Sequence, residues 1–198
     1  MCQFIETIHI EAGQALRLDD HNERMNRTRQ CCLGKRDKIY LEDYLETTPH
    51  QVRTKCRVAY ADQIQAITYD PYRIRPVHAL QLVQDDQADY TYKYQDRSCL
   101  NRAFAQRATA DDVLIVRKGL LTDTTICNIA LWDGDRWWTP DQPLLAGTHR
   151  AALVRVGTIQ ERAIHVNELS QYHRIRLFNA MIEFGEVELP VNAIRKLP

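Results

Sequence analysis

The sequence predicts an α+β fold with two lobes, and three observations support this prediction. Short alternating or apolar runs of strand length recur along the 198 residues. Helical periodicity is confined to a few short stretches between these runs. No repeat, low-complexity tract or long linker divides the chain. We therefore expect a smaller N-terminal lobe at residues 1–84 and a larger lobe at residues 85–198, packed together as a single functional unit.

The first lobe is predicted to combine antiparallel strands with two helices. Residues 4–10 alternate in part, and a Gly-containing turn leads back into a second strand. Asp19 or Asp20 caps a helix that carries Arg24. The further runs predict a short helix at 40–45 and strands at 15–18, 52–60, 63–69 and 77–83.

The second lobe is predicted to be richer in strands. Helical spacing of Leu100, Ala103 and Phe104 predicts a helix at 97–107, and Asp133-Gly134 is a strong hairpin signal. Two further helices are expected at 149–156 and 167–171. Strands are expected at 90–94, 113–116, 120–122, 129–132, 137–139, 162–166 and 174–178, with a final hairpin at 182–191.

Composition is that of an ordinary globular protein. Hydrophobic residues make up 44% and charged residues 26%, and Lys plus Arg equals Asp plus Glu at 26 each. This balance argues against nucleic acid as a partner. No apolar run reaches the ~18 residues that a membrane helix needs, and the N-terminus lacks a signal-peptide pattern. The six cysteines have no metal-ligand spacing, so we expect reduced thiols, no metal site and a cytoplasmic protein.

Lys93 differs from the other five lysines because it is predicted to lie within a strand. Strand alternation puts Tyr90, Tyr92 and Tyr94 on one face and Thr91 with Lys93 on the other. Desolvation lowers the pKa of an amine, so a lysine facing inward from a central strand suits Schiff-base chemistry. An edge strand with Lys93 in water fits the local pattern as well, and the pattern alone leaves both interpretations open.

Two other segments are candidate binding elements. Residues 121–128 place Asp123 among hydroxyls and an amide, where they can surround a polar ligand or form a turn that satisfies its own backbone. Gly147 precedes an apolar helix whose first N–H groups suit an anion, with Arg24 as a candidate cation. A helix that begins at Gly147 without binding any anion would show the same sequence pattern.

Taken in order, these features resemble the class IV aminotransferase family, the fold-type IV pyridoxal-phosphate enzymes. That family includes branched-chain aminotransferase, D-amino acid aminotransferase and 4-amino-4-deoxychorismate lyase. The resemblance runs from residue 4 to about residue 185. It implies a two-lobed fold with a barrel-like sheet in the C-terminal lobe, and it implies a homodimer. Its segments are Phe4-Ile5-Glu6-Thr7, Asp20 to Met25, Lys93 with Leu100-Asn101-Arg102, Leu121 to Ile129, and Trp138-Thr139-Pro140 with Leu144 to Arg150.

The resemblance implies a role for each matching residue. Lys93 would form the Schiff base with pyridoxal 5′-phosphate and move a proton between substrate and cofactor. Asp123 would take the place of the family's Glu opposite the pyridine nitrogen. The cofactor phosphate would bind Arg24 and the backbone N–H groups of Thr148 and His149.

Further contacts follow from the same resemblance. Ile126 and Cys127 fall where the family often has small hydroxyl residues, and Asn179 falls where it places further phosphate or substrate contacts, so all three are candidate cofactor-binding residues. Arg57, on a strand of the small lobe, is the candidate partner of a substrate carboxylate.

Four departures from the family pattern put substrate specificity in doubt. The family's first strand and turn have no counterpart in the sequence. Asp123 is one methylene shorter than Glu, and Thr124 replaces the Gly that follows it. Leu100-Asn101-Arg102 lies further from the lysine than in most relatives.

The implied activity is that of a 4-amino-4-deoxychorismate lyase, which releases pyruvate and makes 4-aminobenzoate for folate synthesis. A class IV amino acid transaminase is the alternative, because the same lysine chemistry supports both reactions. A non-catalytic protein that binds pyridoxal phosphate is a further alternative, and a purely structural domain is the last.

Overall fold

The computed structural model describes residues 3–196 and divides into two compact units. The first comprises the described residues up to Ile74 together with Tyr92–Asp96, and the second comprises Arg75–Thr91 and the described residues from Arg97 onward. The units differ from the predicted lobes in two segments. Residues 75–84 belong to the second unit, and residues 92–96 belong to the first.

The first unit is an antiparallel sheet with one long helix. The sheet order is β2-β1-β3-β4, and the helix α1 spans Leu18–Leu33. The predicted second strand at 15–18 is shorter than expected, because Arg17 adopts a left-handed φ of 54° and α1 begins directly after it. The strands are β1 (Phe4–Glu11), β2 (Gln14–Ala15), β3 (Thr54–Tyr60) and β4 (Ile64–Pro71), and a 3-10 turn η1 covers Leu41–Asp43.

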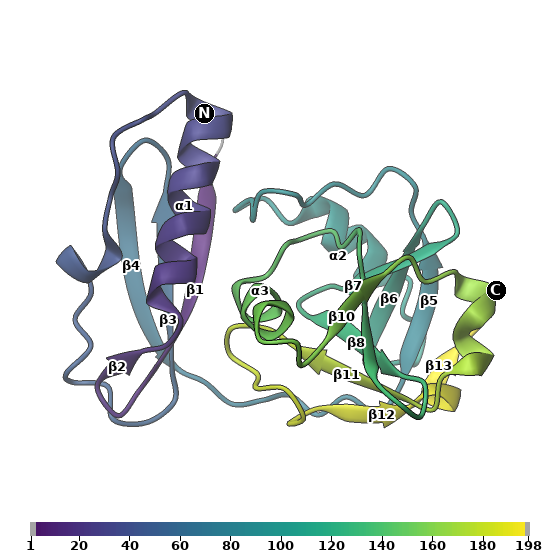
Figure 1. Ribbon diagram of the computed structural model, residues 1–198. Coiled ribbons are helices and arrows are strands. Elements are labelled where there is room, and N and C mark those ends of the chain that lie inside the picture. Colours follow the sequence, from purple (N-terminus) through teal and green to yellow (C-terminus); the bar gives the residue numbers. More distant parts are fainter. Residues whose placement is uncertain (1–2, 197–198) are drawn as a thin grey trace. The chain divides into compact units, whose positions relative to one another are not determined.

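One face of this sheet forms the core of the first unit. Side chains that alternate inward on β1 and β3 pack against Met25 of α1 and Leu41 of η1. Figure 1 shows α1 lying along this face. Glu6 occupies the same alternation and is completely buried, although it carries a carboxylate. The apolar members of this core include Phe4, Ile8, Ile10, Cys56, Val58 and Tyr60.

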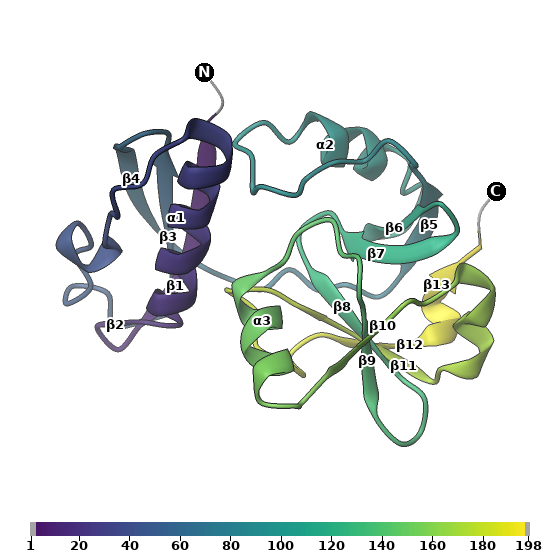
Figure 2. The same ribbon diagram turned by 45° about the horizontal axis from the view of Figure 1, so that its top comes forward.

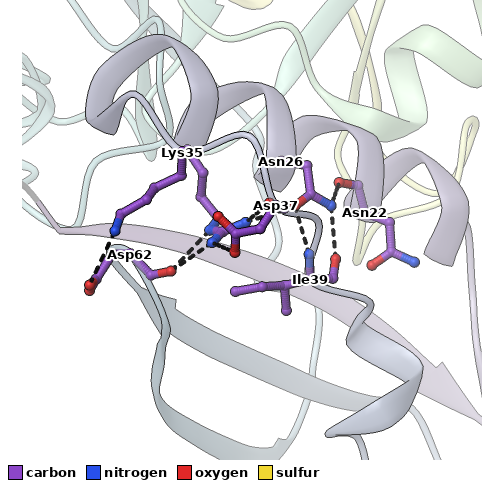
Figure 3. A network of polar contacts seen from close by, with 7 residues as sticks. Asn22, Asn26, Lys35, Asp37, Ile39 and Asp62 are labelled. Atoms are coloured by element: carbon purple, nitrogen blue, oxygen red, sulfur yellow. Dashed lines mark hydrogen bonds and ion pairs between the residues drawn. The ribbon is translucent and has the colours of Figure 1, made fainter.

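Arg29 fixes the loop that follows α1. Its side chain is fully buried, and Nε and Nη2 donate to the carbonyl oxygen of Asp62 at 3.1 and 2.8 Å. Nη2 also donates to the carboxylate of Asp37 at 2.7 Å, and Nη1 donates to the Asn26 side chain at 3.2 Å. Asn26 exchanges two hydrogen bonds with the backbone of Ile39 (Figure 3). One buried cation therefore holds this loop and the β3–β4 turn to α1.

The segment Tyr92–Asp96 adds to the edge of β1 opposite β3. Tyr94 forms an antiparallel bridge with Phe4, and the N–H of Ile5 donates to the carbonyl oxygen of Lys93 at 2.9 Å. The predicted strand at 90–94 is therefore wrong, because only a single bridge forms. Only two of the three tyrosines share a face as predicted. Tyr92 and Tyr94 pack against the first core, whereas Tyr90 belongs to the second unit.

The second unit contains a four-stranded sheet and a five-stranded sheet. Their orders are β13-β5-β6-β7 and β10-β9-β8-β11-β12. Helix α3 packs against the five-stranded sheet through Leu153 and Val154 (Figure 2). The elements are β5 (Leu80–Gln84), α2 (Ser98–Ala105), β6 (Asp112–Arg117), β7 (Leu120–Thr124), β8 (Asn128–Trp132), β9 (Trp137–Pro140), α3 (Thr148–Arg155), β10 (Gln160–Arg162), β11 (Arg174–Phe178), β12 (Glu188–Pro190) and β13 (Ile194–Arg195), with 3-10 turns η2 (Val166–Gln171) and η3 (Val191–Ala193).

Two expectations for the second unit need correction. The sheets do not close into a barrel, because β7 and β8 belong to different sheets and the irregular residues 125–127 lie between them. The final hairpin does not form either. β12 pairs with β11, and Asn179 bridges only Ile182, where its side-chain oxygen accepts the N–H groups of Met181 and Ile182.

Candidate functional site

Lys93 stands on the face of the first sheet opposite the core. Antiparallel pairing of Phe4 with Tyr94 puts Lys93 beside Ile5, and paired residues point to the same face. Alternation along β1 adds Thr7 to that face, and Arg57 pairs with Thr7 on β3. The sheet thus places the half-buried Lys93 and Arg57 on one surface. With strands about 4.8 Å apart and about 3.3 Å per residue, their Cα atoms are separated by roughly 12 Å.

Arg57 forms no ion pair within the described residues 3–196. No hydrogen bond or ion pair to its guanidinium is formed by the side chains of residues 3–196, although it is half-buried. Its neighbours in the same row are Thr7 on β1 and Thr68 on β4, which supply hydroxyls and no charge. The adjacent Lys55 differs, since it pairs with Asp70 at 3.4 Å. Arg57 is therefore suited to bind an anion from solution.

Arg24 belongs to a buried network with Glu6 and His21. Its Nε donates to Glu6 Oε1 at 2.9 Å, and its Nη2 donates to Glu6 Oε2. His21 Nδ1 donates to the same Oε2 at 2.6 Å. Burial raises the pKa of Glu6, but the charge of Arg24 and the His21 hydrogen bond outweigh it and lower the pKa to about 2. Glu6 is therefore ionised, and it fixes the Arg24 guanidinium.

Burial favours the neutral form of His21 in this network. Burial lowers its pKa below the ordinary 6.5 more than the Glu6 hydrogen bond raises it, and the charges of Arg24 and Lys93 lower it further. Lys93 therefore lies close enough to the network to influence His21. The sequence placed His21 and Arg24 on one helix, but it gave no signal that Glu6 joins them.

Asp123 is a buried carboxylate held by hydrogen bonds, of which those from Leu145 and Asn128 are the strongest. The N–H of Leu145 donates to Oδ2 at 2.9 Å, and Asn128 Nδ2 donates to Oδ1 at 2.9 Å. No ion pair to Asp123 exists within residues 3–196. Burial raises its pKa to about 6, and the hydrogen bonds from Leu145 and Asn128, together with smaller effects of Arg150 and the Leu144 N–H, counteract only part of that effect. Such a group favours contact with a cation.

The residues after Asp123 form a compact turn. Thr124 Oγ1 accepts the N–H groups of Ile126 and Cys127 at 3.3 and 3.0 Å. Ile126 is 43% exposed, whereas Cys127 is buried and its pKa is raised to about 12 by burial, so its thiol is unreactive. Asn179 donates to the carbonyl oxygen of Ile126 at 3.0 Å. The structure thus gives Asn179 a role in holding this turn, and its predicted contact with the cofactor stays a prediction.

The turn is also tied to the segment after Lys93. Thr125 Oγ1 donates to the buried carboxylate of Asp112 at 2.7 Å. Arg97 donates to the carbonyl oxygen of Thr125 at 2.8 Å. Neither Arg97 nor Asp112 was singled out from the sequence, because both partners are distant along the chain.

The N-terminus of α3 meets the candidate site at Gly147, which has no side chain to cap the helix. Thr148 and His149 follow, and both are buried. His149 Nδ1 donates to the carbonyl oxygen of Asn179 at 2.9 Å, and Nε2 lies 3.3 Å from Glu183. The predicted role of Thr148 and His149 rests on their backbone N–H groups, whose helix position suits an anion.

Two kinds of feature are absent from the described part of the chain. No group of three or more His, Cys, Asp or Glu side chains there is arranged to hold a metal ion. No helix there is long and apolar enough to cross a membrane.

Several known proteins resemble this chain in sequence. The family model for class IV amino-transferases matches residues 3–189. An "uncharacterized protein" of Haemophilus influenzae is 35% identical over 185 residues, which cover 91% of this chain and 98% of that protein. A "putative aminodeoxychorismate lyase" of Schizosaccharomyces pombe is 34% identical over 87 residues, which cover 41% of this chain and 38% of that protein.

Solved structures resemble the chain in fold. A "putative 4-amino-4-deoxychorismate lyase" from Haemophilus somnus has a TM-score of 0.86 at 32% identity and covers 92% of this chain and 97% of its own. A hypothetical aminotransferase from Mycobacterium tuberculosis in its PLP-bound form has a TM-score of 0.76 at 17% identity. It covers 99% of this chain and 83% of its own and shows the shared fold. The predicted two-lobed α+β class is confirmed.

Proposed function

The chain belongs to the class IV aminotransferase family, and from this premise we propose that it binds pyridoxal 5′-phosphate on Lys93 and eliminates pyruvate from 4-amino-4-deoxychorismate. It is an enzyme of the lyase or aminotransferase type found in that family. The 4-aminobenzoate released would serve folate synthesis.

The cofactor assignment rests chiefly on the buried carboxylate of Asp123. Its pKa of about 6 reflects burial without a contacting cation. A pyridinium N–H against this carboxylate would supply the missing charge and stabilise the ionised pair. Leu145, Asn128 and Leu144 occupy at most three acceptor positions, and a carboxylate has about four. The residues present therefore fit the ring nitrogen of the cofactor, even with Asp in place of the longer Glu.

The phosphate would be held by the start of α3 and by Arg24. Thr148 and His149 present backbone N–H groups at a helix end that carries partial positive charge. Arg24 is fixed by Glu6, and a guanidinium has five N–H donors, so it can serve a phosphate as well as a carboxylate. Ile126 and Cys127 would complete the cofactor surroundings through the turn that they form.

The chemistry would be divided between the cofactor and Lys93. Bound pyridoxal phosphate supplies a protonated ring that accepts electrons from the reacting carbon of the substrate. The Lys93 amine would accept a proton from that carbon, the bond between the ring and the enolpyruvyl oxygen would break as the ring becomes aromatic, and the departing enolpyruvyl group would take up a proton to become pyruvate. Arg57 would bind a substrate carboxylate, because it is a half-buried cation on the same sheet face as Lys93.

The lyase is favoured by two relatives. The Haemophilus somnus and Schizosaccharomyces pombe proteins both carry that activity in their names. A class IV amino acid transaminase is the alternative, and it is supported by the family as a whole. A protein that binds the cofactor without turnover is the remaining alternative. We also propose a cytoplasmic homodimer, which light scattering of the purified protein would test.

Cofactor attachment is tested by borohydride reduction and mass spectrometry. Purified protein mixed with pyridoxal phosphate should show a visible absorbance band, and reduction should leave a pyridoxyl group on the peptide containing Lys93. Lys93→Ala should remove this label, whereas Lys38→Ala, in an exposed loop, should retain it. No label on any lysine would refute the proposed function.

The reaction type is tested with two substrates. The lyase predicts pyruvate release from 4-amino-4-deoxychorismate and no conversion of the bound cofactor to its amine form by glutamate. Conversion by glutamate without pyruvate release would indicate the transaminase. Cofactor binding with neither reaction would indicate the non-catalytic protein.

A further inference from the structure

We propose that Asn128 is a positioning residue that joins the Asp123 carboxylate to the segment leading into α3, so that one amide sets both ends of the cofactor site. This inference rests on the proposed function. It concerns how the second unit holds the ring-nitrogen partner and the phosphate-binding helix in a fixed relation.

The hydrogen bonds of Asn128 span the two segments directly. Its Nδ2 donates to Asp123 Oδ1 at 2.9 Å and to the carbonyl oxygen of Leu145 at 2.8 Å. The N–H of Leu145 donates back to Asp123 Oδ2 at 2.9 Å. Both carboxylate oxygens and both backbone groups of Leu145 are thus engaged in one closed set. The carboxylate cannot rotate without breaking at least one of these bonds.

The close approach of Gly147 shows that the amide is built into this position. A Cβ at residue 147 would lie only 2.1 Å from Asn128 Oδ1 and 3.3 Å from its Cγ. Only glycine therefore allows the Asn128 side chain to sit where it does. Gly147 is also the residue that precedes the first turn of α3. The same contact thus fixes the start of α3 against Asn128, whose amide holds Asp123.

Loss of this amide should change both the charge and the orientation of Asp123. The Asn128 hydrogen bond favours the ionised carboxylate, and burial opposes it. Without the amide, the pKa of Asp123 would rise further, and a neutral Asp123 would no longer hold a proton on the ring nitrogen. The start of α3 would lose its tether at the same time. Cofactor affinity and the pH dependence of the cofactor spectrum should therefore change together.

The test compares Asn128→Ala with Thr139→Val. Thr139 is fully buried on β9 and donates to the carbonyl oxygen of Ile129 at 2.8 Å, so its variant loses one buried hydrogen bond in the same unit without touching Asp123. Pyridoxal phosphate would be titrated into each apoprotein, and the absorbance of the bound cofactor would be followed from pH 5 to 9. Asn128→Ala should weaken binding about tenfold or more and shift the spectral titration. Thr139→Val should lower thermal stability only.

A second variant guards against a folding defect in the first. Gly147→Ala leaves Asn128 intact but forces its amide away from Asp123, so it should reproduce the weaker binding and the shifted titration. Unchanged affinity and titration in both Asn128→Ala and Gly147→Ala would overturn the inference. Equal effects in Thr139→Val would also overturn it, because general destabilisation would then explain them. Failure of the unmodified protein to bind the cofactor would refute the proposed function and, with it, this inference.

Discussion

Replacing Glu6 with Gln removes the charge at the centre of the buried network in the first unit. The pKa of Glu6 is about 2 instead of 4.5, which corresponds to about 3 kcal/mol of stabilisation at neutral pH. The variant also leaves the buried Arg24 without its carboxylate, and breaking such a pair costs about 3–5 kcal/mol. We therefore expect Glu6→Gln to lower the free energy of unfolding by about 3–5 kcal/mol at neutral pH.

The pH dependence gives this prediction a distinct sign. A carboxyl group whose pKa is lowered in the folded state stabilises the protein above its unfolded pKa and loses that effect as pH falls. For Glu6 the contribution is fully present above pH 4.5 and disappears as pH falls toward 2. The difference between the variant and the unmodified protein should thus be largest above about pH 5 and shrink in acid.

Urea unfolding followed by circular dichroism measures this difference. Glu23→Gln is the matched control, because Glu23 faces Arg27 at 3.9 Å with both side chains exposed. That variant should change the free energy of unfolding by less than about 1 kcal/mol. A loss in Glu6→Gln no larger than in the control, or one that does not diminish in acid, would refute the assigned role of the network.

Three further predictions concern other buried polar groups. Arg29→Lys should lower the free energy of unfolding by about 2 kcal/mol or more, since one ammonium cannot replace the forked contacts to Asp37 and the backbone. Urea unfolding would detect this loss, and an unchanged free energy of unfolding would contradict the prediction. Thr125→Val should cost about 1–3 kcal/mol in the same assay, because the buried Asp112 carboxylate loses a donor, and a stabilised variant would oppose this reading. Because the pKa of His21 is lowered in the folded state, its contribution to stability is present above pH 6.5 and is lost as pH falls. NMR titration of the His21 ring should therefore show a midpoint below 6.5, and a midpoint at or above 6.5 would disprove the lowered pKa.

Local patterns predicted most of the fold. The alternation of residues 4–10 and the apolar run at 113–116 correspond to β1 and β6, and the segment at 174–178 is β11. The spacing after Arg97 corresponds to α2. These elements follow from side-chain periodicity, which the sequence displays directly.

Elements decided by distant partners were harder to predict. The tyrosines at 90–94 suit a strand, but Tyr90 is drawn into the second unit and Tyr94 into the first. Residues 182–191 carry hairpin residues, yet β12 finds its partner in β11. Each outcome depends on competition between packing partners, which local propensity does not encode.

The candidate site shows the same division. The order of motifs was enough to single out Lys93 and Asp123. Glu6 and Asn128 were not assigned site roles, because their partners belong to other elements. A buried carboxylate at Glu6 even conflicts with the apolar alternation around it, and only Arg24 and His21 explain its presence.

The return of Tyr92–Asp96 to the first unit limits how this gene can be divided. A fragment ending at residue 74 would encode the first sheet without Lys93 and without the bridge from Tyr94 to Phe4. The complementary fragment would carry Lys93 but no β1 to pair with it. If the protein is split at this point, both fragments should therefore have to be co-expressed before Lys93 can return to its position beside β1. Exchange of one lobe between relatives should succeed only when this short segment travels with the N-terminal part.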